Sequence, residues 1–350
     1  MISKEISENI LATIGHTPMV KLNKIVKNSK HEFYAKMEYF NPGGSVKDRL
    51  ALAIIEQAEK RGQLKPGGTI VEATAGNTGM GLALVAAVKG YKCIFVLPEK
   101  MSEEKRAMLR AYGARVVITP TGVEPENPLS HYSVAKKIAD SIPNSLYANQ
   151  YHNPDNFEVH YKITAPEIWN QMNEQIDVFA AGVGTGGTLS GVAKYLKEKN
   201  PNTKILCADP VGSILYDLFY HGKVIDPPGA YKVEGVGEDM LPENCHLKLY
   251  SDFVKVNDKE AFQMTRRLVL EEGLCVGPSS ALILVGAMKY AERLDKPSKI
   301  VVMMPDSGKA YLSKVFNDQW MVENQFLDKT EASSRFNVEV KATEELKKYQ

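Results

Sequence analysis

Short apolar segments alternate with amphipathic segments along most of the chain, and this alternation strongly limits the folds that it can adopt. Alternating strands and helices are typical of parallel sheets whose faces are covered by helices. The sequence therefore predicts an α/β protein. The predicted strands are 33–39, 69–73, 92–97, 115–119, 177–181, 204–208 and 299–304, and the predicted helices are 45–60, 78–89, 102–112, 130–141, 155–172, 188–199, 259–272 and 279–294.

The chain is long enough for two lobes, because it has 350 residues and domains commonly contain about 100–200. We predict a smaller N-terminal α/β lobe over 41–157. A larger α/β lobe is predicted to combine 1–40 with 158–326, so that a cleft lies between the two. Residues 327–350 lack strong apolar periodicity, and we expect a solvated helical tail or a linker there.

Composition excludes several classes of protein. A hydrophobic content of 44%, a charged content of 24% and a formal net charge of +1 indicate neither a nucleic-acid surface nor an acidic tail. Apolar stretches such as 81–88 are much shorter than the roughly 18 residues of a membrane span. We therefore expect a cytoplasmic protein that acts on small molecules and has neither nucleic-acid nor membrane partners.

The cysteines and histidines show no metal-binding spacing. Cys93, Cys207, Cys245 and Cys275 are widely separated and lack a C-x-x-C motif, so we expect buried free thiols. The seven histidines are scattered and form no H-x-x-x-H pair. We expect no metal site.

A turn containing Pro42, Gly43 and Gly44 precedes the helix at 45–60 and places Lys47 near its first turn. The positive end of the helix dipole disfavours an ammonium ion and helps to keep a lysine amine available as a nucleophile. An ordinary solvated first turn after a Pro-Gly-Gly loop would have the same residues. Lys47 is therefore a candidate nucleophile whose role depends on the rest of the sequence.

Three more glycine-containing segments stand between predicted strands and helices, where parallel α/β sheets bind ligands. In 71–79, small residues allow a ligand to approach the backbone N–H groups, while Asn77 and Thr78 supply directed hydrogen bonds. This segment is a candidate carboxylate site, although a polar helix cap would fit it equally well.

The other two segments point to a phosphate and a ring nitrogen. Residues 182–188 include four glycines and two threonines before a helix, which suits a phosphate held by main-chain donors. They match neither the Walker A loop nor G-x-G-x-x-G, so we do not expect ATP or GTP. Residues 277–280 could place the Ser279 hydroxyl in the cleft, or could be a plain serine N-cap. Together with Lys47, these segments match the requirements of pyridoxal 5'-phosphate.

Three motifs carry a resemblance to a known family. Residues 41–49 (NPGGSVKDR), 74–79 (TAGNTG) and 184–188 (GTGGT), in this order, resemble the cysteine synthase and cystathionine beta-synthase family of pyridoxal-phosphate enzymes. The resemblance extends over about 10–326. It implies the two-lobed, tryptophan-synthase-like fold of type II pyridoxal-phosphate enzymes, usually as a homodimer, with amino-acid substrates.

The resemblance also implies roles for individual residues. Lys47 would form the Schiff base, Asn77 would lie next to the phenolic oxygen of the cofactor, and Ser279 would meet the pyridine nitrogen. The phosphate would be held by Gly184, Thr185, Gly186, Gly187 and Thr188. The substrate carboxylate would be held by Thr74, Ala75, Gly76, Asn77 and Thr78 with Gln150, and the loop containing Gly235 would face the substrate.

Within the family, the sequence resembles the cystathionine synthases most at residues 97–102, 209–215, 233–237 and 317–321. The implied reaction condenses L-serine with L-homocysteine to L-cystathionine and water. Use of O-acetylserine with sulfide or homocysteine, and a non-catalytic binding role, are the alternatives. Neither haem nor adenosylmethionine control is expected, because no segment before 10 or after 326 resembles the modules that would provide it.

Three positions depart from the family pattern: Ala75 replaces a common Ser, Pro278 a common Gly, and Glu238 the Tyr of animal cystathionine synthases. Glu238 bears most directly on the reaction, because the hydroxide of serine is a poor leaving group and needs a proton from a nearby acid. Glu238 or the adjacent Asp239 could supply that proton or could position the amine of homocysteine. Both could also be solvated loop carboxylates.

Overall fold

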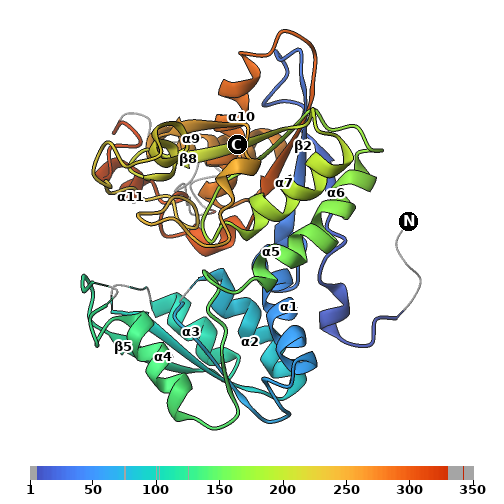
Figure 1. Ribbon diagram of the computed structural model, residues 1–350. Coiled ribbons are helices and arrows are strands. Elements are labelled where there is room, and N and C mark those ends of the chain that lie inside the picture. The colour runs from blue at the N-terminus through green and yellow to red at the C-terminus, as the bar shows by residue number, and fades with distance from the viewer. Residues whose placement is uncertain are drawn as a thin grey trace.

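The computed structural model describes residues 6–329, except 75, 100, 102 and 125, and also residue 342. These residues form two sheets with helices packed on them (Figure 1). The larger sheet has the strand order β1-β2-β10-β7-β8-β9, and the smaller one has the order β5-β4-β3-β6. Neighbouring strands are parallel except β1 and β2. The predicted α/β fold with parallel-rich sheets is confirmed.

The larger sheet consists of β1 (Met19–Lys21), β2 (Glu32–Met37), β7 (Val178–Ala181), β8 (Lys204–Pro210), β9 (Asp252–Val256) and β10 (Lys299–Met304), and the smaller sheet consists of β3 (Thr69–Glu72), β4 (Lys92–Pro98), β5 (Arg115–Thr119) and β6 (Ser145–Tyr147). The helices are α1 (Lys47–Lys60), α2 (Asn77–Lys89), α3 (Glu103–Ala111), α4 (His131–Ser141), α5 (Asp155–Val159), α6 (Ala165–Gln171), α7 (Gly187–Lys199), α8 (Leu215–His221), α9 (Asp258–Arg267), α10 (Pro278–Ala291) and α11 (Asp318–Glu323). Helices α1 to α4 lie around the smaller sheet (Figure 1). The lobe boundaries at 41 and 157 stay a prediction, and most of the predicted tail lies outside the described residues.

Several elements were not predicted from the sequence: β1, β6, β9, α8 and α11. β1 and β6 have three residues each, which is too short to show a period. Their extended form depends on pairing, β1 with β2 and β6 with β3. β1 and β6 could not be recognised from the sequence because pairing with a neighbouring strand, rather than a local pattern, defines them.

Two predicted helices, 155–172 and 259–272, contain a change of helical type. The first consists of α5, a π-helical turn at His160–Thr164, and α6. The second is α9 followed by a π-helical turn at Leu268–Glu272. Wide π turns often occur at functional sites, and the turn at His160–Thr164 lies next to the candidate site described below.

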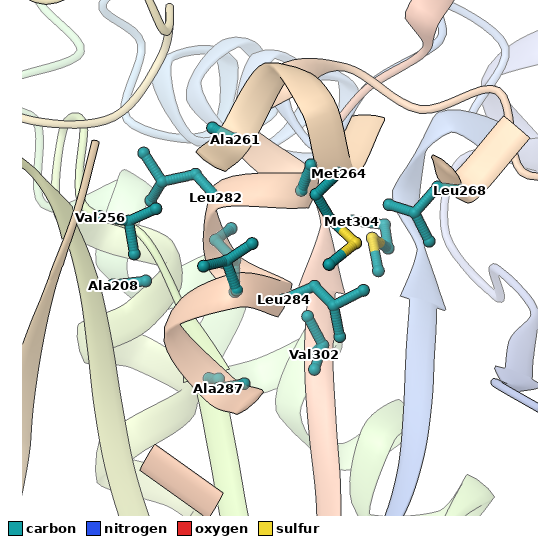
Figure 2. Close-up of a cluster of buried hydrophobic side chains, with 14 of the residues drawn as sticks. Ala208, Val256, Ala261, Met264, Leu268, Leu282, Leu284, Ala287, Val302 and Met304 are labelled. Atoms are coloured by element: carbon teal, nitrogen blue, oxygen red, sulfur yellow. The ribbon is translucent and has the colours of Figure 1, made fainter. Parts of the chain in front are cut away.

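The core of the larger sheet is built around α10. Nearly every residue of this helix is buried, as expected for a helix that is apolar on all sides. Its Leu282 and Leu284 lie among Val256 of β9 and Val302 and Met304 of β10 (Figure 2). α10 is therefore fixed from its first turn onward, which holds Ser279 in place.

The beginning of α1 is packed closely against α2. A Cβ added at Gly81 of α2 would lie 2.9 Å from Ala51 Cβ and 3.0 Å from Lys47 O. Glycine is the residue that permits this approach. The backbone of Lys47 is thus held against the smaller lobe.

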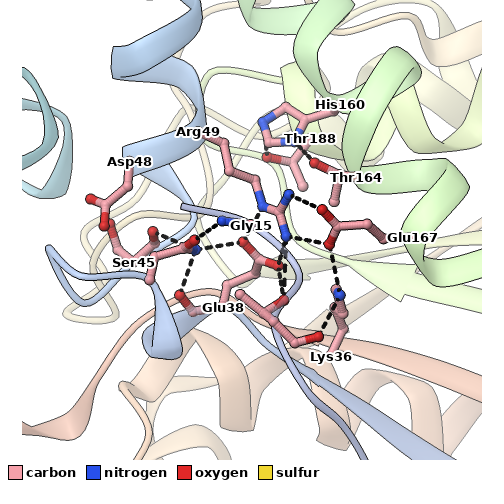
Figure 3. A network of polar contacts seen from close by, with 12 residues as sticks. Gly15, Lys36, Glu38, Ser45, Asp48, Arg49, His160, Thr164, Glu167 and Thr188 are labelled. Atoms are coloured by element: carbon pink, nitrogen blue, oxygen red, sulfur yellow. Dashed lines mark hydrogen bonds and ion pairs between the residues drawn. The ribbon is translucent and has the colours of Figure 1, made fainter. Parts of the chain in front are cut away.

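A buried ionic network ties the same part of α1 to the larger lobe (Figure 3). Arg49 Nε donates to Glu38 Oε2 at 2.7 Å, and its Nη1 and Nη2 donate to Glu167 Oε1 and Oε2 at 2.8 and 2.7 Å. Lys36 Nζ of β2 also donates to Glu167 Oε2, at 3.0 Å. Although burial alone would raise the pKa of Glu167, Arg49 lowers it to about 2. Glu167 is therefore bound in its charged form.

Replacing Arg49 with Met should destabilise the protein strongly. The variant would leave two buried carboxylates without their main partner, which costs about 3–5 kcal/mol of the free energy of unfolding. Lys136→Met is the matched control, because Lys136 and Asp140 form an exposed pair within α4 whose loss costs less than about 1 kcal/mol. Urea unfolding of both variants measures the difference. Equal, small changes would contradict a structural role for the network.

Candidate active site

A cavity opens at the carboxyl ends of β7 and β10, where a ligand site was predicted. It is lined by Val46, Lys47, Asn77, Ala181, Gly182, Gly184, Thr185, Gly186, Thr188, Glu234, Gly235, Val236, Ser279, Met303, Pro305 and Asp306. The structure thus brings together the predicted lysine turn, the 182–188 loop, the Ser279 helix start and the Gly235 loop. These segments are far apart in sequence but share one cavity.

Lys47 is held at the cavity by the end of β10. Val46 N donates to Pro305 O at 2.8 Å, and Ser45 pairs with Asp306 in an isolated bridge. Lys47 Nζ donates to Thr185 Oγ1 at 3.3 Å. Burial lowers the pKa of Lys47 to about 8, against the opposing effects of Glu238 and Asp306. A neutral amine is therefore accessible near pH 8. The main cause is burial of the amine, rather than the helix dipole that the sequence suggests.

The loop at 184–188 has a shape that only glycine allows. Gly186 has φ +87° and caps α7, and a Cβ there would lie 2.6 Å from Cys245 N. A Cβ at Gly184 would lie 2.7 Å from Gly235 O. The N–H groups of the first turn of a helix have no acceptor within the helix and attract anions. The loop therefore has the geometry of an anion cradle, and its role in holding a phosphate stays a prediction.

Ser279 lies in the first turn of α10 and is buried. It is one of the residues that line the cavity. A buried hydroxyl normally has a partner. A ligand atom in the cavity would provide one.

Asn77 is oriented by a residue that the sequence analysis missed. Its Nδ2 donates to Asp306 Oδ2 at 2.8 Å, and Tyr311 OH donates to the same oxygen at 2.7 Å. Asp306 is buried, which raises its pKa, and its Oδ1 has no hydrogen-bond partner among the residues that the structure describes. The sequence feature that could have revealed Asp306 is its position two residues after the end of the predicted strand 299–304, followed by Ser307 and a glycine. Asp306 fixes the amide of Asn77 in the cavity wall.

The predicted carboxylate site is only partly assembled around the cavity. Thr78 Oγ1 donates to Gln150 Oε1 at 2.5 Å, and Gly76 N donates to Thr74 Oγ1 at 3.3 Å. Ala75 lies outside the described residues. Gln150 and Thr78 are thus brought together as expected, but of the predicted carboxylate-binding residues that the structure describes, Asn77 is the one that lines the cavity.

Glu238 lies beside the cradle on the loop that follows Gly235. Tyr151 OH donates to Glu238 Oε1 at 3.2 Å, and Glu238 N donates to Ser213 Oγ at 3.2 Å. Burial raises the pKa of Glu238 to about 8, although the Tyr151 hydroxyl and Lys47 oppose this shift. Glu238 is therefore a neutral acid at pH 7, whereas Asp239 is exposed.

Glu234, another residue that the sequence analysis missed, bridges the two lobes at the cavity. It forms ion pairs with Lys105 of α3 and with Lys314, which follows β10; the Lys314 pair is 2.5 Å long. The sequence feature that could have revealed Glu234 is its position directly before Gly235.

Among the residues that the structure describes, no group of three or more His, Cys, Asp or Glu is arranged to hold a metal ion. No helix in the described ranges is long and apolar enough to cross a membrane.

Comparison with known proteins identifies the family. Residues 10–306 match the family model described as "Pyridoxal-phosphate dependent enzyme". The chain is 46% identical over 325 residues to cystathionine beta-synthase of Apis mellifera, covering 92% of this chain and 64% of that protein. It is 47% identical to cystathionine beta-synthase of Mus musculus over 93% of this chain and 58% of that protein. The chain thus spans about three fifths of the length of these two relatives.

Shorter relatives match over nearly their whole length. Cysteine synthase of Staphylococcus aureus (strain N315) is 43% identical, with 87% of this chain and 96% of that protein covered. A crystal structure of a hydrogen sulfide-producing enzyme from Fusobacterium nucleatum superimposes with a TM-score of 0.80 at 38% identity, covering 88% of this chain and all of that one.

The chain therefore belongs to the family of pyridoxal-phosphate dependent enzymes. The predicted type II, tryptophan-synthase-like fold and the predicted cofactor, pyridoxal 5'-phosphate, are confirmed. Relatives named cystathionine beta-synthase and relatives named cysteine synthase both match most of the chain.

The cavity fits this cofactor. A half-buried lysine has a lowered pKa, the backbone of the 184–188 loop is packed so closely that positions 184 and 186 accept only glycine, and Ser279 lines the cavity at the start of α10. Each feature suits a different part of the cofactor: its aldehyde, its phosphate and its ring nitrogen.

Proposed function

We propose that this enzyme condenses L-serine with L-homocysteine to give L-cystathionine and water. The proposal is supported by the similarity to cystathionine beta-synthases over more than nine tenths of the chain. The observation that carries it is Glu238, a carboxyl group with a pKa of about 8 that interacts electrostatically with Lys47. A neutral acid that can give up a proton is what a hydroxide leaving group needs.

We assign the cofactor contacts as the sequence predicts. Lys47 would carry the covalent link to the cofactor, Gly184 to Thr188 would hold the phosphate, and Asn77, fixed by Asp306, would face the phenolic oxygen. When bound, pyridoxal 5'-phosphate supplies an electron sink, and a neutral Ser279 hydroxyl at its ring nitrogen keeps that sink weak, which favours rapid loss of the β substituent.

Two residues handle protons during the first half of the reaction. The Lys47 amine removes the α-proton of serine. As the Cβ–O bond breaks, Glu238 donates its proton to the hydroxyl, which leaves as water. Tyr151 donates to Glu238 Oε1, so the proton of Glu238 is expected on the other oxygen, free to transfer.

The second half reverses these transfers. Homocysteine loses its thiol proton to the solvent, its thiolate sulfur forms a bond to Cβ, and the Glu238 carboxylate regains a proton from the solvent. The Lys47 ammonium then returns a proton to Cα, so both residues recover their starting states. Thr78 and Gln150 would hold the substrate carboxylate, and the Gly235 loop would cover the site and exclude water.

A second candidate function uses O-acetylserine in place of serine, with sulfide or homocysteine as the thiol. The cysteine synthase relative, which the chain covers almost completely, favours it. A non-catalytic binding role has less support, because Lys47, Asn77 and Ser279 all line the cavity.

An activity matrix separates these functions. Purified protein is assayed with serine and O-acetylserine as donors and with homocysteine and sulfide as thiols. We expect the highest rate with serine and homocysteine. A higher rate with O-acetylserine and sulfide would overturn the proposal in favour of cysteine synthase, and no turnover in any combination would favour a binding role.

Glu238→Gln should reduce turnover selectively with serine. The amide keeps the shape but cannot donate a labile proton, so we expect a loss of about 10²-fold with serine. Acetate leaves without a proton, so the loss with O-acetylserine should stay below about 3-fold. The measurement compares kcat for both donors at one homocysteine concentration.

Asp239→Asn is the control for Glu238→Gln, because Asp239 is adjacent but exposed. It should leave both rates almost unchanged. Equal losses with both donors in Glu238→Gln would indicate that Glu238 positions the thiol substrate, and no loss would show that it is a solvated loop carboxylate.

We also propose a cytoplasmic homodimer. Cys93, Cys207 and Cys245 are buried free thiols, as predicted, and Cys275 is half-buried. Free thiols suit a reducing compartment. Sedimentation or light scattering of the purified chain measures its oligomeric state.

A further inference from the structure

Two buried residues that do not line the cavity lie directly behind the cradle. Asn156 of α5 and His160 of the adjoining π-helical turn have no exposed surface. Asn156 Nδ2 lies 2.8 Å from Thr185 Oγ1. His160 Nε2 lies 3.1 Å from Thr188 Oγ1 (Figure 3). Each of the two loop threonines therefore has one buried polar partner behind it.

The hydrogen bonds of Asn156 fix the direction of the Thr185 hydroxyl. Asn156 Nδ2 also donates to Gln150 O at 2.9 Å. A flipped amide would place two oxygens together, so the nitrogen must face both partners. Thr185 Oγ1 then accepts from Asn156 and also from Lys47 Nζ at 3.3 Å. Because Thr185 Oγ1 accepts hydrogen bonds from two donors, the hydroxyl hydrogen of Thr185 can donate to a third group.

The state of His160 decides the direction of the Thr188 hydroxyl. Burial, together with the positive charges of Lys47 and Arg49, lowers the pKa of His160 well below its usual value. The imidazole is therefore neutral and has one N–H and one lone pair. Its Nδ1 lies 2.9 Å from Thr164 Oγ1. Either Nδ1 donates to Thr164 and Nε2 accepts from Thr188, or Thr164 donates to Nδ1 and Nε2–H donates to Thr188.

An anion in the cradle selects the second arrangement. If Nε2 accepted the Thr188 hydrogen, the lone pairs of Thr188 would face the negative charge. If Nε2–H donates, the Thr188 hydrogen is free to reach the anion. Such donors are important here because Lys47 is the one cationic residue among the described residues that line the cavity, which also include Glu234 and Asp306. The phosphate must be held mainly by neutral donors.

We propose that Asn156 and His160 are positioning residues that turn the hydroxyl hydrogens of Thr185 and Thr188 into the cradle, with His160 as the Nε2–H tautomer, so that both threonines donate to the cofactor phosphate. This inference rests on the proposed phosphate-binding role of residues 184–188. The close packing of α7 supports it, because a Cβ at Gly191 would lie 2.9 Å from His160 Cβ. Glycine there lets the π-helical turn reach Thr188.

The test replaces His160 in two ways. In His160→Gln, the side-chain amide nitrogen can occupy the place of Nε2 and still donate to Thr188, whereas the shorter side chain of His160→Asn cannot reach it. Apo-protein of each variant is titrated with pyridoxal 5'-phosphate and with pyridoxal, which lacks the phosphate. Loss of one oriented, charge-assisted donor should weaken binding of the phosphorylated ligand about 10- to 100-fold in His160→Asn.

The control ligand separates a phosphate effect from a general one. Binding of pyridoxal to His160→Asn should change less than about 3-fold, and His160→Gln should bind pyridoxal 5'-phosphate within about 5-fold of the unmodified protein. Equal losses for both ligands would show a merely structural role and overturn the proposal. Unchanged binding of pyridoxal 5'-phosphate to His160→Asn would overturn it as well.

Two more measurements complete the test. Nitrogen NMR of the cofactor-loaded protein with ¹⁵N-labelled histidine should show His160 protonated at Nε2, and protonation at Nδ1 would overturn the inference. Titration of Gly186→Asp provides the reference for the cradle itself. If Gly186→Asp loses affinity and His160→Asn does not, only this inference fails, whereas unchanged affinity in Gly186→Asp rejects the proposed phosphate site.

Discussion

Lys47→Ala should produce a folded protein that lacks the visible absorbance of the cofactor-linked enzyme and has almost no activity. The amine would form the covalent link and move the α-proton, so both functions are lost together. General acid–base catalysis alone contributes about 10²- to 10⁴-fold, and we expect at least that loss in turnover. Absorption spectra and assays of the purified variant measure both effects.

The fold should tolerate this change. Alanine is the best helix former, and removal of a buried amine relieves the desolvation that lowers the pKa of Lys47. The main chain at this point is held by Val46 and Pro305 rather than by the lysine side chain. The melting temperature should therefore stay close to that of the unmodified protein.

Lys60→Ala is the matched control for Lys47→Ala, because Lys60 ends the same helix and is exposed. It should keep both absorbance and turnover. Borohydride reduction of the loaded protein, followed by peptide mass analysis, should locate the modified lysine at position 47. Modification of another lysine, or full turnover in Lys47→Ala, would refute the central assignment.

Gly186→Asp should weaken the binding of pyridoxal 5'-phosphate at least about 100-fold, which corresponds to roughly 2.8 kcal/mol of binding free energy. A carboxylate in the cradle would repel the phosphate. The positive φ of Gly186, +87°, and the distance of 2.6 Å from the added Cβ to Cys245 N show that the loop must also shift. The structural cost is therefore larger than the loop sequence alone suggests.

Two other variants separate these effects. Gly186→Ala adds the Cβ without the charge, so the difference between the two variants at position 186 measures the electrostatic part. Gly222→Asp places the same side chain at another glycine of positive φ, +67°, with no atom within 4 Å of the added Cβ. Gly222 lies at the end of α8, away from the cavity, and its variant should bind the cofactor normally. Titration of the three apo-proteins gives the comparison, and normal binding by Gly186→Asp would show that the loop has another role.

Much of the architecture could be predicted from the sequence because it depends on local patterns. Buried parallel strands need continuous apolar runs, and 299–304 and 204–208 show them. Sharp turns before a helix need glycine, and residues 184–188 contain glycine at 184, 186 and 187. The glycine loop at 184–188 and the position of Lys47 at a helix start could therefore be predicted from residue types and their order.

Tertiary structure alone decided which distant groups act on these residues. Asp306 reaches Asn77 from 229 positions away, and Arg49 binds Glu167 across 118 positions. No local period records such pairs, because side chains come together only when the sheets are assembled. The same reason explains β1 and β6, which are too short to be recognised without the strands that they pair with.

The protonation states in the site also belong to the assembled fold. The sequence identifies Lys47, Glu238 and His160 as residue types with ordinary pKa values, and burial moves the pKa of Lys47 and of Glu238 to about 8. Burial also keeps His160 neutral. Desolvation depends on every atom that surrounds a group. The sequence determined which chemical groups are available, and the packing around them determined which of those groups hold a proton at neutral pH.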